Sequence, residues 1–296
     1  MIKFKITPIT RKGRRMLNFK PRLTWRPDNT QPLPNGQTSF NDALLRDSIN
    51  KLQSVASTVQ TPVQEVNGVL DLRQFCPPVD DQGQLSDCVA DATCSSLEFV
   101  KIRNGVSYSK LSRLFLYYNA RLQVQETNVD QGTYIRLAFS TLATIGTCNE
   151  STWTYDQNMV FTRPSWSSYQ EAYLNRITSF FTVPQDIVYT GGGLLVNAIK
   201  QSLQAQHPVV FGMTVDDAYQ QVGPDGVVAM PLLVRQNPGG HCQMICGYDN
   251  NKQTWIVQNS WGTGWGDNGF CYCPWTYLDA SNANDIWTPY MQGSTP

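Results

Sequence analysis

The chain has 296 residues, of which 41% are hydrophobic and 16% charged, and its formal net charge is zero. This length is enough for two compact domains, or for one large domain with an extension. Its hydrophobic core is large enough to fold without disulfide bonds. The eight cysteines are scattered along the chain, which argues against a small disulfide scaffold and makes a reducing compartment the simpler assumption.

The neutral total hides an uneven distribution of charge. Residues 1–27 hold nine of the 23 basic residues and no acidic one, which leaves 14 basic against 23 acidic residues in the rest of the chain. The sequence therefore describes a basic arm on an acidic body. The opening, MIKFKITPITRKGRRMLNF, has no apolar core of a secretory signal, and no run of about 20 apolar residues predicts a membrane span. We expect a cytoplasmic or virion-associated protein with no membrane partner.

Residues 1–66 read as an N-terminal extension. The first 40 residues are rich in Pro, Arg, Asn and Thr and lack periodicity, whereas 40–57 spaces apolar residues at helical intervals and predicts one amphipathic helix. A stretch punctuated by Pro and Gly then leads to Cys88.

Helices come first in the remaining chain and strands later. We predict helices over 88–103, 109–126, 132–145, 166–176 and 193–205. Strands are predicted over 207–215, 241–248, 254–260 and 269–273, with the turn DNNK at 249–252 making a hairpin of the middle two. This order favours an α+β protein with two lobes.

Cys88 stands where the first long helix begins, in DQGQLSDCVAD. A helix N-terminus beside an imidazolium can lower the pKa of a cysteine thiol from about 8.5 to roughly 3 to 4, which makes a thiolate nucleophile. Buried packing would be the default interpretation of a lone cysteine, so the interpretation as a nucleophile depends on a base.

The chain offers two histidines. His207 precedes a proline and a strand, which favours a structural role at a strand edge. His241 follows NPGG and opens a strand whose hairpin partner ends at Asn259, so the amide of Asn259 can reach and orient the imidazole. Gln82 can offer its amide to an oxyanion beside the Cys88 N–H, and such a donor is typically worth about 2.7 to 4 kcal/mol.

These segments resemble the papain family of cysteine peptidases. The resemblance rests on DQGQLSDC and on GGHCQMICGYDNNKQTWIVQNSWGTGWGDNGF, in matching order and spacing, and covers roughly 67–275. It is closest to the cathepsin-like branch without signal peptides in bacteria, archaea and viruses. It implies a papain-like two-lobed fold, with a helical lobe mainly over 88–185 and a β-rich, barrel-like lobe mainly over 186–275, an active-site cleft between them, and no cofactor or metal.

Carried over residue by residue, the resemblance implies hydrolysis of peptide bonds in protein or peptide substrates through a thioester acyl-enzyme. Cys88 is the expected nucleophile, His241 the base and then acid, Asn259 the orienting residue and Gln82 the oxyanion donor. The residues expected to bind substrate or shape the cleft are Trp261, Trp265, Gly132 and Gly240.

The sequence departs from the family beside the nucleophile. The usual disulfide-bonded cysteine three residues upstream is Leu85, and the residue directly before the nucleophile is Asp87. A carboxylate there opposes thiolate formation unless it points away or is paired.

Other interpretations of these residues and segments remain open. Trp261 and Trp265 could be ordinary core aromatics. Cys242, Cys246, Cys271 and Cys273 could bind zinc, although their spacing favours small buried hydrophobes or an incidental disulfide. The same scaffold could transfer acyl groups to an amine, or be a silent module whose basic residues 1–27 bind nucleic acid or another polyanion. The alternative for residues 1–27 is a solvated tail, which the sequence favours. For residues 1–66 we expect an inhibitory prosegment, as in a zymogen, ahead of a peptidase domain over 67–296.

Overall fold

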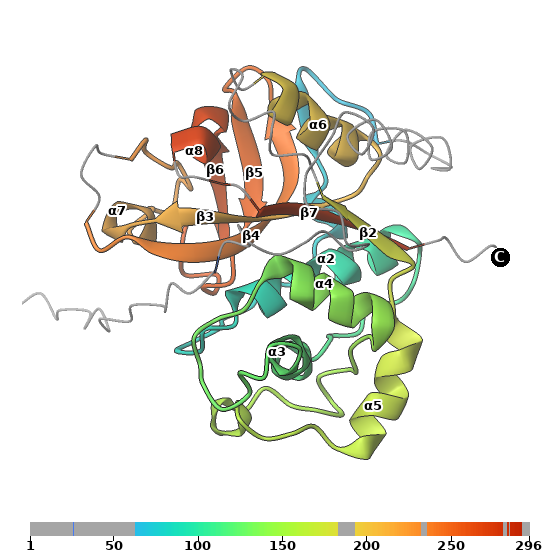
Figure 1. The fold of residues 1–296 in the computed structure, drawn as a ribbon. Coiled ribbons are helices and arrows are strands. Elements are labelled where there is room, and N and C mark those ends of the chain that lie inside the picture. The colour runs from blue at the N-terminus through green and yellow to red at the C-terminus, as the bar shows by residue number, and fades with distance from the viewer. Residues whose placement is uncertain are drawn as a thin grey trace, which may run out of the picture.

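The structure is a computed structural model that describes Arg26 and residues 63–182, 193–231, 236–280, 283 and 285–291. Its described part has a helical portion and a portion built on one antiparallel sheet, with helix α2 between them (Figure 1). The expected α+β architecture is thereby confirmed.

The longer helices follow the predicted periodic segments closely. The α-helices are α2 Cys88–Arg103, α3 Arg113–Leu122, α4 Ile135–Thr144, α5 Trp166–Ala172, α6 Gly193–Gln204, α7 Asp217–Gln220 and α8 Trp275–Ala280. Short 3₁₀ turns are η1 Arg73–Phe75, η2 Gln157–Met159 and η3 Tyr173–Asn175.

Capping sets where two of the helices begin. The prediction over 109–126 starts too early because Ser112, in extended conformation, accepts a hydrogen bond from Phe115 N and fixes the start of α3 at Arg113. Tyr134 is likewise extended, so α4 begins at Ile135 and not at 132.

The sheet has seven strands, all paired antiparallel, in the order β2-β7-β3-β4-β5-β6, with β1 also paired to β4. The strands are β1 Val69–Asp71, β2 Ser179–Thr182, β3 Val209–Val215, β4 Gly239–Asp249, β5 Thr254–Gln258, β6 Phe270–Pro274 and β7 Asp285–Tyr290. The predicted hairpin is present, because Asp249 of β4 pairs with Thr254 of β5 across the turn.

Three strands were not predicted. β1 and β2 are only three and four residues long, too short to show an alternation. β7 contains Pro289, which lowers the expectation of a strand, yet it pairs with both β2 and β3.

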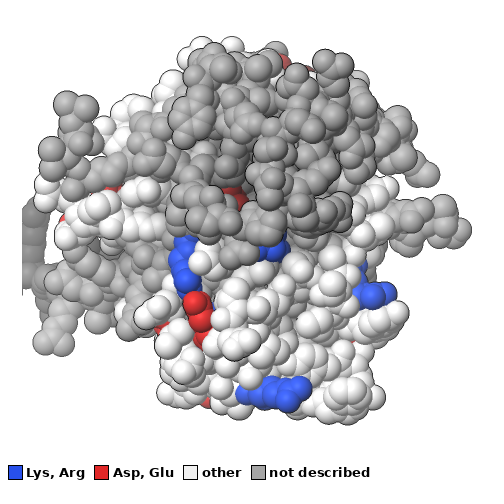
Figure 2. Space-filling view, in the orientation of Figure 1, with Lys and Arg blue, Asp and Glu red and all other residues white. Residues whose placement is uncertain are grey.

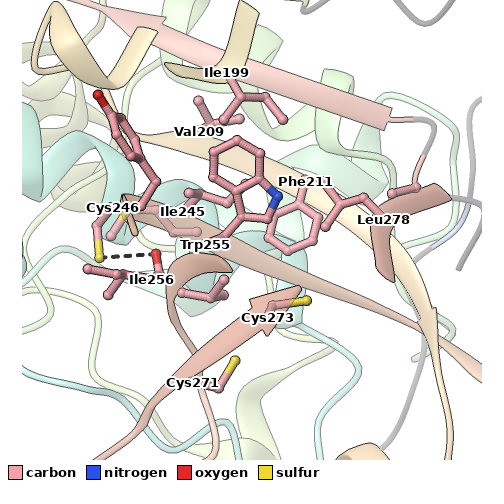
Figure 3. Close-up of a cluster of buried hydrophobic side chains, with 14 of the residues drawn as sticks. Ile199, Val209, Phe211, Ile245, Cys246, Trp255, Ile256, Cys271, Cys273 and Leu278 are labelled. Carbon is pink, nitrogen blue, oxygen red and sulfur yellow. Dashed lines mark hydrogen bonds between the residues drawn. The ribbon is translucent and has the colours of Figure 1, made fainter. Parts of the chain in front are cut away.

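Two clusters of buried side chains form the core. One joins the sheet to α6 and α8 around Trp255, as Figure 3 shows. Cys246, Cys271 and Cys273 are buried in this cluster, and Cys246 Sγ donates to Ile256 O at 3.5 Å. The other cluster packs α2, α3 and α4 together.

Helix α2 is buried along almost its whole length, from Cys88 to Lys101. A helix enclosed in this way lies inside the molecule and does not cover a surface. It packs against α3 and α4 on one side and against β4 on the other. The start of α2 is therefore held rigidly between the two portions of the fold.

Most of residues 1–66 lie outside the described residues, including the predicted helix at 40–57 and the whole basic arm except Arg26. Among the helices in the described part, none combines the length and the apolar character that crossing a membrane requires.

Candidate active site

Cys88 is the first residue of α2, and its side chain is completely buried. It belongs to the same buried cluster as Cys242 of β4. Burial raises the pKa of the Cys242 thiol, and the neighbouring Cys88 thiol adds to that rise. Because Cys242 directly follows His241, the fold brings the start of α2 to the start of β4.

A pocket marks the same meeting point. It is lined by Asp91, Ala92 and Ser95 of α2 on one side and by residues that include Cys242 and Asn259 on the other. The first turns of α2 therefore lie beside both strands of the hairpin that carries the predicted base.

His241 and Asn259 are joined by a hydrogen bond of 2.7 Å between Nε2 and Oδ1. The backbone N–H of Ser260 donates to the same Asn259 atom at 2.8 Å, which identifies it as the amide oxygen. An amide oxygen only accepts hydrogen bonds, so Nε2 carries the proton and Nδ1 keeps its lone pair. The contact expected from the hairpin is present.

The surroundings of His241 keep its ring neutral. The side chain is fully buried, and burial lowers its pKa to about 4, against the opposing effect of the Asn259 hydrogen bond. Nδ1 is buried and has no hydrogen-bond partner among the described residues. The ring thus presents an unprotonated nitrogen that can accept a proton.

Trp261 covers the imidazole. The two rings are stacked with centroids 4.4 Å apart. Trp265 meets Trp261 edge to face at 5.3 Å, and its Nε1 donates to Gln220 O at 3.1 Å. Trp261 thus lies over the ring that bonds Asn259, and Trp265 packs against Trp261.

Gln82 is buried at the junction of the two portions. Its Oε1 accepts from Ser260 Oγ at 2.7 Å, and its Nε2 donates to Leu85 O at 3.0 Å. Its backbone N–H donates to Ser260 O at 2.9 Å. One strand end thus orients both Asn259 and Gln82, because Ser260 contacts each of them.

Asp87 precedes Cys88 and is the N-cap residue of α2, but its side chain makes no capping hydrogen bond. Instead Asp87 Oδ2 accepts from the hydroxyl of Tyr155 at 2.7 Å. The same hydroxyl lies 2.9 Å from Gln82 O. Burial raises the pKa of Asp87 to about 6, against the opposing effects of Arg113 and Tyr155. One carboxylate oxygen of Asp87 is therefore paired with Tyr155, while the other, Oδ1, is buried without a hydrogen-bond partner among the described residues.

Residues 130–132 are attached to the loop before the nucleophile. Asp130 Oδ1 accepts from Ser86 N at 3.0 Å and from the hydroxyl of Tyr117 at 2.7 Å, and Ser86 Oγ donates to Asp130 O at 3.1 Å. Gly132 N donates to the same Tyr117 hydroxyl at 3.1 Å. Gly132 has a φ of 81°, a conformation that favours glycine. Through Asp130 and Tyr117, the segment that contains Gly132 is therefore hydrogen-bonded to Ser86, two residues before Cys88.

Gly240 lies in β4 directly before His241, is partly buried, and pairs with Thr214 of β3. A residue without a side chain there leaves the backbone next to His241 open to close approach.

The second histidine and the cysteines that were considered as zinc ligands have other surroundings. His207 is buried ahead of β3, where its Nδ1 lies 3.1 Å from Pro289 O and burial lowers its pKa to about 3. All eight cysteines have free thiols, and no group of three or more metal-binding side chains occurs among the described residues.

Sequence reasoning missed Tyr155, Asp130 and Ser260. Tyr155 and Asp87 are 68 positions apart, and Asp130 and Ser86 are 44 apart, so no local pattern links either pair. A contact between Ser260 and Asn259 could have been predicted, because Ser260 directly follows Asn259 at the end of the strand.

The chemistry that these residues can perform is acyl transfer through sulfur. A thiol at a helix N-terminus, an oriented neutral imidazole and an amide donor are the groups that such a reaction needs.

Comparison with known proteins gives the same result. The sequence model of a family described as papain family cysteine protease matches residues 67–278. An uncharacterized peptidase C1-like protein of Acanthamoeba polyphaga mimivirus is 30% identical over 258 residues, which cover 83% of this chain and 82% of that protein.

Solved structures share the fold. Xylellain, a cysteine protease from Xylella fastidiosa, superposes with a TM-score of 0.65 at 28% identity and covers 78% of this chain and 90% of its own. Digestive procathepsin L 3 of Tenebrio molitor larval midgut has a TM-score of 0.61 at 18% identity, over 82% of this chain and 79% of its own, which shows likeness of fold alone.

Proposed function

The chain belongs to the papain family of cysteine proteases and is a cysteine-type peptidase, and we propose that Cys88 is its nucleophile and His241 its general base. One observation carries the assignment of these residues. His241 has its Nε2 proton committed to Asn259, while its Nδ1 is buried without a hydrogen-bond partner among the described residues, at the strand end that approaches the start of α2.

The proposed reaction begins when the Cys88 thiol gives its proton to Nδ1 of His241. The thiolate attacks the scissile carbonyl carbon, and the oxygen of that carbonyl becomes an oxyanion. One amide hydrogen of Gln82 is engaged by Leu85 O, and the second one, with the backbone N–H of Cys88, holds the oxyanion.

The imidazolium then protonates the leaving amine, and the carbon–nitrogen bond breaks to leave a thioester on Cys88. Water, deprotonated at Nδ1 of His241, attacks the thioester carbon; the carbon–sulfur bond breaks to release the acid, and the proton on Nδ1 returns to the Cys88 thiolate. Asn259 keeps the ring in place throughout, since the Nε2 proton is never transferred.

We assign roles in the substrate cleft to four further residues. Gly132 and Gly240 provide backbone that an extended peptide can approach, and Trp265 borders the leaving-group side. Trp261 protects the base from water. The positions of Gly132 near Ser86 and of Gly240 before His241 support this assignment.

An epoxide inhibitor of thiol proteases tests the site. We expect the inhibitor to label the wild type and Cys76→Ala but not Cys88→Ala; Cys76 is the matched control because it is the only cysteine that is not fully buried. Cleavage of a peptide library should follow the labelling. Labelling of Cys88→Ala would contradict the assignment, and isopeptide products in place of hydrolysis would indicate an acyl transferase.

We further propose that residues 1–66 restrain the peptidase until they are removed. Support comes from Arg26, whose side chain is docked on the peptidase portion at Glu126 and Tyr134. Incubation of the purified chain, with its N-termini read by mass spectrometry, should show loss of this segment as activity rises. Undiminished activity of the intact chain would count against the restraint.

Binding of a polyanion is a separate proposal that rests on the basic arm. Residues 1–27 hold nine basic residues and no acidic one, and such segments often contact phosphate groups. Together with the viral relative, this supports a cytoplasmic or virion-associated location. Retention of the full chain on DNA should fall steeply with added salt, and no retention at low salt would exclude this binding.

A further inference from the structure

Arg26 is held by the peptidase portion through several contacts at once. Its guanidinium donates to both carboxylate oxygens of Glu126, with Nη2 3.3 Å from Oε1, and Nη2 also donates to the hydroxyl of Tyr134 at 3.1 Å. The guanidinium carbon lies 4.8 Å from the centre of the Tyr134 ring. A carboxylate fork, a hydroxyl and an aromatic face together recognise a planar cation.

The two residues that hold Arg26 are fixed by their own backbone. Glu126 lies in the turn after α3, where its N–H donates to Arg121 O at 3.0 Å. Tyr134 is the N-cap residue of α4, and its carbonyl accepts from Leu137 N and Ala138 N. The site is therefore built by the peptidase fold, and it is occupied by Arg26, which is 100 positions from Glu126 in the sequence.

The site lies along the segment to which we assign substrate contacts. Tyr134 is two residues beyond Gly132, and Asp130 is bonded to Ser86, which is two residues before the nucleophile. An extended peptide paired with this segment would carry a side chain past Glu126 and Tyr134 within two or three residues of its scissile bond.

Charge and exposure would allow a substrate side chain to replace Arg26 in this site. The side chains of Arg26 and Glu126 are 30% and 32% exposed, so the pair is reachable from solvent. The described surface of the helical portion shows few charged side chains in the view of Figure 2. A cation of the substrate would therefore find a defined partner at Glu126 that solvent can reach.

We propose that Glu126 and Tyr134 form a subsite for a positively charged substrate side chain, with arginine preferred, and that Arg26 occupies it in the intact chain. This inference rests on the proposed function of the neighbouring site. It names a substrate class, namely peptides with a basic residue two or three positions before the scissile bond.

The test compares two peptides that differ only by arginine or citrulline at one of these positions, since citrulline keeps the shape and loses the charge. The ratio of their kcat/KM values is measured for Arg26→Ala, for the double variant Arg26→Ala with Glu126→Gln, and for Arg26→Ala with Asp225→Asn. Asp225 is the matched control, an exposed acid on the turn after α7.

We expect Arg26→Ala to prefer arginine by roughly three- to tenfold, as a partly exposed charge-assisted pair allows. The preference should fall to about one when Glu126 is changed and persist when Asp225 is changed. Equal cleavage of both peptides by Arg26→Ala, or a preference that survives Glu126→Gln, would overturn the subsite.

A binding measurement keeps this inference separate from the catalytic proposal. A fluorescent peptide with the sequence of residues 22–30 should bind Arg26→Ala more tightly than its counterpart with citrulline in place of residue 26, as read by anisotropy. Equal affinities would reject the subsite even if hydrolysis proceeds. Absence of all hydrolysis together with selective peptide binding would instead reject the proposed function alone.

Discussion

Nε2 of His241 and Oδ1 of Asn259 are 2.7 Å apart, and Ser260 N donates to the same amide oxygen and fixes its orientation. This arrangement selects the imidazole tautomer with a bare Nδ1. Replacing Asn259 with alanine should lower kcat by roughly a hundredfold, because the imidazole of His241 is then no longer held in position to take the proton of Cys88.

Asn259→Asp is the informative partner to that variant. A carboxylate still accepts from Nε2 and from Ser260 N, so more activity should survive than in the alanine variant. Its charge favours the imidazolium and raises the pKa of His241 from its value of about 4. The acid limb of the kcat/KM profile should therefore move to higher pH. Equal losses in both variants would argue against an orienting role.

Tyr155→Phe tests the support beneath the nucleophile. The hydroxyl bonds Asp87 and lies 2.9 Å from Gln82 O, so its loss should lower kcat about three- to tenfold with a smaller effect on KM. The Tyr155 bond lowers the pKa of Asp87, which burial raises to about 6 while Arg113 opposes and Asp130 assists the rise.

The ionisation of Asp87 should be visible in the pH dependence of kcat/KM. Above pH 6 the ionised Asp87 opposes the thiolate, so wild-type kcat/KM should step downward there. In Tyr155→Phe the step should move to higher pH, and in Asp87→Asn it should disappear. A step that stays at the same pH in all three proteins would assign it to another group.

Asp130→Ala should raise KM by roughly tenfold. It removes the acceptor of Ser86 N and of the Tyr117 hydroxyl, and unpaired donors of this kind cost about 1 to 3 kcal/mol. Asp130→Asn keeps one side-chain oxygen and should retain a KM near that of the wild type. Steady-state kinetics with one peptide distinguishes them; a fall in kcat alone would assign Asp130 to the catalytic step.

Glu98 controls stability, since it is buried in α2 and accepts from Leu111 N at 2.6 Å. Burial raises its pKa from 4.5 to about 8, so the folded protein keeps this proton after the unfolded chain has lost it. Stability should therefore fall as the pH rises from about 4.5 to 8.

Glu98→Gln cannot ionise, so its Tm should decline less over this interval and exceed that of the wild type at pH 8 and above. Glu65→Gln, at an exposed glutamate, is the control and should follow the wild type. Parallel Tm curves for Glu98→Gln and the wild type would refute the assignment.

Local patterns in the sequence were enough to predict the groups that lie on one hairpin. The turn at 249–252 pairs Asp249 with Thr254, and the hairpin carries Asn259 towards His241 after a one-residue register shift between Ile245 and Gly247 that the sequence did not predict. The helix that begins at Cys88 follows from periodicity in the same way. Each of these depends on residues close together in the chain.

The supporting groups could not be predicted, because they come from distant loops. Tyr155 and Asp130 reach the nucleophile loop because α3 and α4 pack on α2 in the folded chain. Arg26 reaches Glu126 across 100 positions. Polar partners of this kind carry no periodicity, and their identity is decided by tertiary packing.

All eight cysteine thiols are free, and the position at which the family usually has a disulfide-bonded cysteine before the nucleophile is Leu85. Hydrogen bonds from Ser86 to Asp130 tie that loop to the rest of the fold. Strong reductants such as dithiothreitol can therefore be used freely to regenerate an oxidised Cys88, since they have no cross-link to cut and leave the architecture intact.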